Sequence, residues 1–85
     1  MNHFAAPEFW QTYGDLPPEV RDLADKKFAL LKADPHHSSI RLKKVGQYWS
    51  ARIGLHYRAL ARERADGLVW FWIGPHREYD HFIRS

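Results

Sequence analysis

The strongest constraint on the fold is a short apolar run near the C-terminus, Val69-Trp-Phe-Trp-Ile73, which stops at Gly74-Pro75. A run of this length and composition is typical of a strand that is buried on both of its faces. Strand alternation predicts that Trp70 and Trp72 point to one face and that the residues between and beside them point to the other. Such a strand gives rigid support to the residues that follow it.

The chain from residue 40 onward alternates with a period of two and predicts a sheet. Four segments have the pattern of strands: residues 40–45, 48–54, 57–64 and 68–73. Gly46-Gln47 and Asp66-Gly67 have the composition of two-residue hairpin turns. Short turns join antiparallel neighbours, so these strands are expected to follow one another as a meander. Residues 3–5 could add one short edge strand.

The first third of the chain predicts two helices. Pro7 suits the first turn of a short helix that Gly14 would end. A second helix is expected to open at Pro17-Pro18 and to end at Asp34-Pro35, because the residue before a proline disfavours the helical conformation. The expected fold class is therefore α+β, in a single domain over residues 1–85. An N-terminal helical hairpin would pack on one face of a twisted antiparallel sheet of about four strands.

Composition narrows the class of protein. Of the 85 residues, 15% are aromatic, which compensates for the small core of so short a chain. The net charge of +3 suits a polyanionic partner. The absence of cysteine excludes disulfides and thiolate metal sites. No apolar run is long enough to span a bilayer and no leader is evident, so we expect a cytoplasmic protein with no membrane partner.

Four polar side chains follow the apolar strand within six positions: His76, Arg77, Tyr79 and His81. An imidazole that titrates near neutral pH, a guanidinium and a phenol form a possible set for phosphate chemistry. A histidine at a strand end is also often a polar residue with no chemical role. The spacing of the six histidines does not match a zinc site, and we expect neither a metal nor another cofactor.

Basic residues occur at alternating positions along the predicted strands, except that Lys44 falls on the parity of Ile40 and Leu42. The set comprises Arg41, Lys43, Lys44, Arg52, Arg58, Arg62 and Arg64. One interpretation is a solvated sheet face, and the other is a concave floor for a phosphate backbone, left open because the helices cover one face only. Alternation places Arg52 on the face away from the helices. Tyr48, beside these residues, could stack on a base or close the edge of the core.

The order and spacing of these motifs resemble the RelE/ParE superfamily of toxins from bacterial toxin–antitoxin modules. The resemblance covers nearly the whole chain. It is carried by Leu16-Pro-Pro-Glu-Val20, Leu30-Leu-Lys-Ala-Asp-Pro35, Ile40-Arg-Leu-Lys-Lys-Val45, Trp49-Ser-Ala-Arg-Ile-Gly54, Tyr57-Arg-Ala-Leu60 and Trp72-Ile-Gly-Pro-His-Arg-Glu-Tyr79.

The resemblance implies a toxin that is a ribosome-dependent messenger RNA endoribonuclease and is neutralised by a cognate antitoxin. In such enzymes the 2′-hydroxyl attacks the adjacent phosphate without a metal. The positions that match catalytic places in the family are His76, Tyr79, Arg58, Lys44 and Arg77. The positions that match RNA contacts are Arg41, Lys43, Arg52 and Tyr48. The alternative is a ParE-like inhibitor of DNA gyrase, or a catalytically silent member that only binds its antitoxin.

The chemistry of each matching side chain indicates its role in the implied reaction. His76 would transfer protons near neutral pH, whereas Tyr79, with a reference pKa near 10, would donate a proton or position the substrate. Arg58 and Arg77 would bracket the phosphate and Lys44 would add a point charge. An antitoxin would lie across the domain, over exposed apolar residues expected beside Tyr13 on the first helix.

Overall fold

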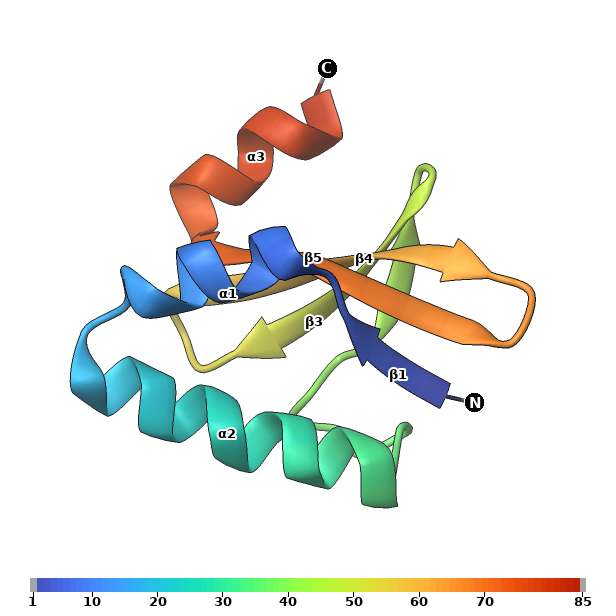
Figure 1. Ribbon diagram of the computed structural model, residues 1–85, viewed down its shortest axis with the longest axis horizontal. Helices are drawn as coiled ribbons and strands as arrows, with labels where there is room; N and C mark the ends of the chain where they lie inside the picture. The colour runs from blue at the N-terminus through green and yellow to red at the C-terminus, as the bar shows by residue number, and fades with distance from the viewer. Residues whose placement is uncertain (1, 85) are drawn as a thin grey trace.

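Prolines and glycines mark most element boundaries in the computed structural model, which describes residues 2–84 (Figure 1). The elements follow in this order: β1 (Asn2–Ala5), α1 (Pro7–Gly14), α2 (Pro18–Ala33), β2 (Lys43–Val45), β3 (Tyr48–Ile53), β4 (Tyr57–Arg64), β5 (Gly67–Pro75) and α3 (His76–Arg84). Both predicted N-terminal helices are present with the expected ends. No helix within residues 2–84 is long and apolar enough to cross a membrane.

The sheet has the strand order β1-β5-β4-β3-β2. Strands β2 to β5 form the predicted antiparallel meander, and β1 adds a parallel edge strand beside β5, so the sheet is mixed and has five strands. Asn2 pairs with Gly67, where a side-chain Cβ would overlap the carbonyl of Asn2. Glycine at this position therefore allows the fifth strand to approach. The turn before it consists of Ala65 and Asp66, one residue earlier than predicted.

Strand β2 is shorter than the predicted segment 40–45. Arg41 has a φ of +50°, a left-handed conformation that interrupts the extended chain. Ile40 is nevertheless buried, and its carbonyl accepts a hydrogen bond of 2.6 Å from the backbone N–H of Arg52. The chain before β2 therefore stays attached to β3 without forming a regular ladder.

The first core lies between the sheet and the helices α1 and α2. Phe9 of α1 and Leu31 of α2 are both buried against sheet residues such as Ile53 and Trp70. The aromatic ring of Phe28 meets Trp70 edge to face at 5.4 Å. Both N-terminal helices thus cover one face of the sheet, as the sequence predicted.

The prediction that Trp70 and Trp72 point to the same face is wrong, because β5 contains a β-bulge. Leu60 pairs with Trp72 and Ala61 pairs with Trp70, so Phe71 is an extra residue between two ladder positions. Trp70 therefore joins the first core, whereas Phe71 and Trp72 both belong to a second one. Simple alternation fails here because one residue of β5 has no partner in β4.

The second core lies on the opposite face, where α3 packs. Its buried members are Leu60, Phe71, Trp72 and Tyr79. Figure 1 shows α2 and α3 on opposite sides of the sheet. The expectation of a sheet covered on one side only is therefore wrong: α3 covers part of the second face, and the basic residues occupy the remainder beside it.

Candidate functional site

The candidate site lies on the sheet face that carries α3. Arg52 of β3 pairs across the ladder with Arg58 of β4, and both side chains are half-buried. The neighbours of Arg52 along the strand, Ala51 and Ile53, are buried in the first core. Arg52 therefore points away from α1 and α2, as alternation predicted.

The carbonyl of Gly54 holds both guanidinium groups in place. It accepts a hydrogen bond of 3.1 Å from Arg52 Nε and one of 3.4 Å from Arg58 Nη1. Arg58 Nη1 also donates to the carbonyl of Tyr57 at 2.8 Å. Gly54 has a φ of +71°, and a Cβ there would lie 2.8 Å from Leu23 Cδ2. The backbone conformation favours glycine, and a Cβ would also displace the end of the Leu23 side chain.

Three arginines form what we call the arginine cluster: Arg41, Arg52 and Arg58. Burial lowers the pKa of Arg58, and the charges of Arg52 and Arg41 lower it further. The salt bridges within residues 2–84 are Lys44–Glu63 and His76–Asp80, so no carboxylate in that part of the chain forms a salt bridge with the cluster, although the charges of Tyr79 and Asp80 raise the pKa of Arg58. Adjacent cations without a paired carboxylate are an electrostatic arrangement that favours an anionic ligand.

The first turn of α3 places the imidazole of His76 at the end of the sheet where Arg58 pairs with Gly74. His76 Nε2 lies 3.8 Å from Asp80 Oδ1, and 49% of the His76 side chain is exposed. The backbone N–H of His76 donates to the carbonyl of His56 at 2.8 Å. This bond attaches the start of α3 to the β3–β4 turn that also contains Gly54. The candidate site at this end of the sheet is therefore assembled from β3, β4 and α3.

Tyr79 occupies a different environment from the one its predicted catalytic role requires. Its side chain is only 4% exposed and belongs to the second core. The ring stacks on His76 with 5.5 Å between the centroids, and a tyrosinate charge would act on Arg58. Tyr79 therefore fixes α3 on the sheet behind His76. Arg77, next to His76 in α3, is exposed.

The two lysines of β2 point to opposite faces. Lys43 pairs with Ser50 and so shares the face of the arginine cluster, whereas Lys44 pairs with Trp49. Lys44 Nζ lies 3.8 Å from Glu63 Oε1, which also accepts a hydrogen bond of 2.9 Å from Trp49 Nε1. The structure does not bring Lys44 to His76, and Lys43 is the lysine on the face of the candidate site.

Tyr48 lies on the same face and packs against the second core. Its ring packs at 5.3 Å from that of Phe71, and Arg62 lies 4.1 Å above the same Phe71 ring. Tyr48 thus closes the edge of the second core. Trp49 and Tyr57 have the corresponding role at the first core.

Sequence reasoning missed two contributors to the site, Asp80 and Gly54. The spacing of four residues between His76 and Asp80 is a detectable signal, because residues at i and i+4 are neighbours on a helix. The role of Gly54 depends on contacts made by its carbonyl and has no comparable signal. Within residues 2–84, no group of three or more metal-binding side chains could hold an ion.

The sequence matches a family model, and the fold is similar to those of several solved structures. The ParE-like toxin domain family matches residues 18–81. The RelB–RelE antitoxin–toxin complex from Methanococcus jannaschii is similar with a TM-score of 0.72 and 17% identity, over 93% of this chain and 98% of that chain. The YoeB/ParE toxin from Agrobacterium tumefaciens has a TM-score of 0.66 and 16% identity, over 89% and 99%.

A third solved structure has the same fold. The toxin–antitoxin complex RelBE2 from Mycobacterium tuberculosis has a TM-score of 0.60 and 22% identity, over 87% of this chain and 95% of that chain. None of the curated proteins matches the sequence. At these identities, the solved structures establish a shared fold over nearly the full length of each chain.

Proposed function

The chain belongs to the ParE-like toxin family of the RelE/ParE superfamily, and we propose that it is a ribosome-dependent messenger RNA endoribonuclease. A cognate antitoxin would hold it inactive. Two of the similar structures are complexes of a toxin with its antitoxin, which supports such a partner. Ribosomes and messenger RNA as targets imply that the protein acts in the cytoplasm.

The observation that carries the proposal is the arginine cluster beside His76. Phosphoryl transfer from RNA to its own 2′-hydroxyl needs cations that balance charge on the phosphorane and a group that transfers protons. Arg52 and Arg58 are held by the Gly54 carbonyl and have no paired carboxylate in the described chain. His76 is exposed at the same end of the sheet. This combination supports metal-independent cleavage.

The proposed mechanism assigns each group one task. His76 accepts the proton of the 2′-hydroxyl as that oxygen attacks the phosphorus, and the Asp80 carboxylate stabilises the imidazolium that forms. The arginine cluster binds the phosphate oxygens, with Arg77 and Lys43 as further cations. The departing 5′-oxygen takes a proton from water or from the ribosome. The products are a 2′,3′-cyclic phosphate and a free 5′-hydroxyl.

Inducible expression with three readouts tests the proposal. Growth, messenger RNA integrity and DNA supercoiling should be followed for the wild type, His76→Ala, Arg58→Ala and Tyr79→Phe. Removal of a general acid–base group costs roughly a hundredfold or more in rate, so His76→Ala should remain folded and lose messenger RNA cleavage and growth arrest. His81→Ala is the matched control, because His81 is an exposed histidine of the same helix.

A second candidate function is inhibition of DNA gyrase. The burial of Tyr79 and the orientation of Lys44 leave fewer reactive groups than the nuclease resemblance implies, which favours a non-catalytic role for the same basic face. In that case His76→Ala would retain full toxicity, supercoiling would change, and messenger RNA would stay intact. That result would refute the nuclease proposal. If the protein is a catalytically silent member that only binds its antitoxin, its expression should change neither messenger RNA integrity nor DNA supercoiling.

A further inference from the structure

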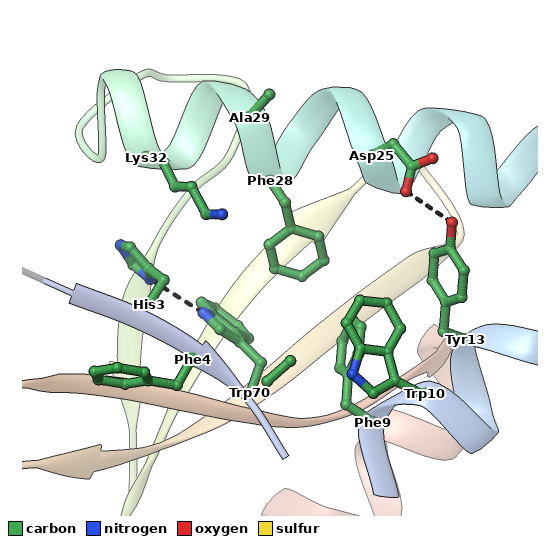
Figure 2. Close-up of a pocket in the computed structure, with 11 residues that line it drawn as sticks. His3, Phe4, Phe9, Trp10, Tyr13, Asp25, Phe28, Ala29, Lys32 and Trp70 are labelled. Atoms are coloured by element: carbon green, nitrogen blue, oxygen red, sulfur yellow. Dashed lines mark hydrogen bonds between the residues drawn. The ribbon is translucent and has the colours of Figure 1, made fainter. Parts of the chain in front are cut away.

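A second concave site lies on the opposite side of the molecule from the arginine cluster. It is a groove of about 370 Å³ between β1, α1 and α2 (Figure 2). Its walls are mainly aromatic, and polar groups lie at its two ends. The residues that matter to the argument are His3, Trp10, Asp25, Phe28, Lys32 and Trp70. None of them contributes to the candidate nuclease site.

The hydrogen bond between Trp70 and His3 determines the tautomer of this histidine. Trp70 Nε1 donates to His3 Nδ1 at 3.1 Å, because an indole N–H can only donate. In the neutral imidazole, the remaining proton is therefore on Nε2. Burial lowers the pKa of His3, and the charge of Lys32 contributes to the same shift, so the neutral form is favoured.

The Nε2–H group of His3 is a buried donor without an acceptor. Nε2 is inaccessible to solvent and has no hydrogen-bond partner within residues 2–84. A buried polar group left unpaired is costly, and such groups in native proteins commonly indicate a missing partner. Figure 2 shows the Lys32 side chain extending from α2 toward the His3 ring. Two donors thus converge at one end of the groove.

The carboxylate that lines the groove, Asp25, lies at the other end. Asp25 Oδ1 accepts a hydrogen bond of 2.7 Å from the Tyr13 hydroxyl, and this bond raises the pKa of Tyr13. No salt bridge of Lys32 is present in the described part of the chain. The His3 end therefore lacks an anionic acceptor, and the site is chemically complementary to a carboxylate.

Two aromatic side chains that line the groove are exposed to solvent. Trp10 is 55% exposed and Phe4 is 44% exposed. The indole of Trp10 packs edge to face on Tyr13, with ring centroids 5.4 Å apart, and therefore forms a firm platform. This agrees with the expected exposed apolar residues beside Tyr13. Large exposed aromatics around a hollow are typical of a surface that binds another protein.

We propose that this groove binds a segment of the antitoxin in which a bulky apolar side chain packs on Trp10 and an Asp or Glu carboxylate accepts hydrogen bonds from His3 Nε2 and Lys32 Nζ. The inference rests on the proposed toxin function and adds to it the chemistry of the segment. A second copy of this chain fits less well, because the chain has a net charge of +3 and would present the same donors. An acidic, apolar segment is complementary to both features.

The decisive experiment is calorimetric titration of the full chain with the protein product of the adjacent reading frame. His3→Asn keeps an acceptor where Nδ1 stands and removes the Nε2 donor, whereas His3→Gln can place an amide donor near the Nε2 position. Lys32→Gln removes the charge, and Lys26→Gln, on an exposed position of the same helix, is its control. His3→Asn and Lys32→Gln should each weaken binding by roughly tenfold or more. His3→Gln and Lys26→Gln should bind the antitoxin with an affinity within about threefold of that of the wild type.

A small probe tests the carboxylate site without the antitoxin. In nitrogen–proton NMR, 3-phenylpropionate should saturably shift the indole N–H of Trp70, and the neutral analogue 3-phenylpropanol should shift it much less. Equal shifts with both compounds would overturn the carboxylate assignment.

The outcomes separate this inference from the toxin proposal. If His3→Asn and Lys32→Gln bind the antitoxin with wild-type affinity, the groove is not the carboxylate site, and the partnership itself stands. If the wild type does not bind the antitoxin, the proposed partnership and the occupant assigned to the groove both fail, while messenger RNA cleavage still tests the nuclease proposal. Thermal unfolding of each variant verifies that the fold is intact.

Discussion

At the scale of single residues, Gly54 affects both the candidate site and the packing of α2 on the sheet. Its carbonyl holds Arg52 and Arg58, and its positive φ directs the chain from β3 into the turn. The absent side chain also leaves space for Leu23 of α2 on the other face of the sheet. One glycine therefore connects the first core with the geometry of the candidate site.

We expect Gly54→Ala to destabilise the domain by about 1–3 kcal/mol, because a residue with a Cβ is strained at this φ and would press on Leu23. Urea denaturation measures the loss. Gly14→Ala is the control, since a Cβ at Gly14 meets nothing within 4 Å and alanine favours a helix. Equal stability of Gly54→Ala and the wild type would show that the turn can adopt another conformation.

At the scale of elements, the position of α3 depends on Tyr79. The ring is buried in the second core and stacks on His76, so it determines where the imidazole lies relative to the arginine cluster. The bulge at Phe71 contributes to the same core, because it places two successive aromatic residues of β5 under α3. The site thus depends on packing behind it as much as on its own polar groups.

Tyr79→Ala should detach α3, at a cost of about 3–5 kcal/mol for loss of a large buried ring. Hydrogen exchange should accelerate in α3 and the end of β5, while the first core around Trp70 stays protected. Tyr79→Phe retains the ring and should leave the exchange pattern of the wild type. Unchanged protection of α3 in Tyr79→Ala would mean that other residues of the second core hold the helix.

At the scale of the whole molecule, the two faces of the sheet have different partners in our proposals. The face with the arginine cluster would bind the phosphate backbone of RNA, and the groove between β1, α1 and α2 would bind the antitoxin. The net charge of +3 is small, so the local concentration of arginines, more than the total charge, would attract RNA.

Binding of a single-stranded RNA oligonucleotide should therefore weaken as salt increases. Each phosphate contact contributes about 0.7 to the slope of log affinity against log salt concentration, so Arg52→Gln should reduce the slope by roughly that amount. Lys26→Gln, on the exposed side of α2, should leave the slope unchanged. Fluorescence anisotropy at several salt concentrations measures both. If both variants change the slope equally, the attraction is not specific to the arginine face.

Local signals in the sequence determined the two N-terminal helices and the antiparallel order of strands β2 to β5. Pro7 and Pro18 start helices, and the glycine-containing and short polar turns form hairpins, because these effects act within a few residues of the chain. Strand alternation also predicted that Arg52 faces away from α1 and α2, since β3 is regular. The same rule placed Lys44 on the parity of the core residue Leu42, although the family resemblance implied a catalytic role for it.

Only the tertiary structure decided features that depend on contacts between distant segments. The bulge at Phe71 sends Trp70 and Trp72 to opposite faces, and it arises where β5 pairs with β4. The burial of Tyr79 depends on the packing of α3 against the sheet, which no local periodicity specifies. The unpaired donor of His3 exists because residues 67 positions apart meet when β1 pairs with β5. Local conformation follows from neighbouring residues, but the environment of a side chain follows from the assembled fold.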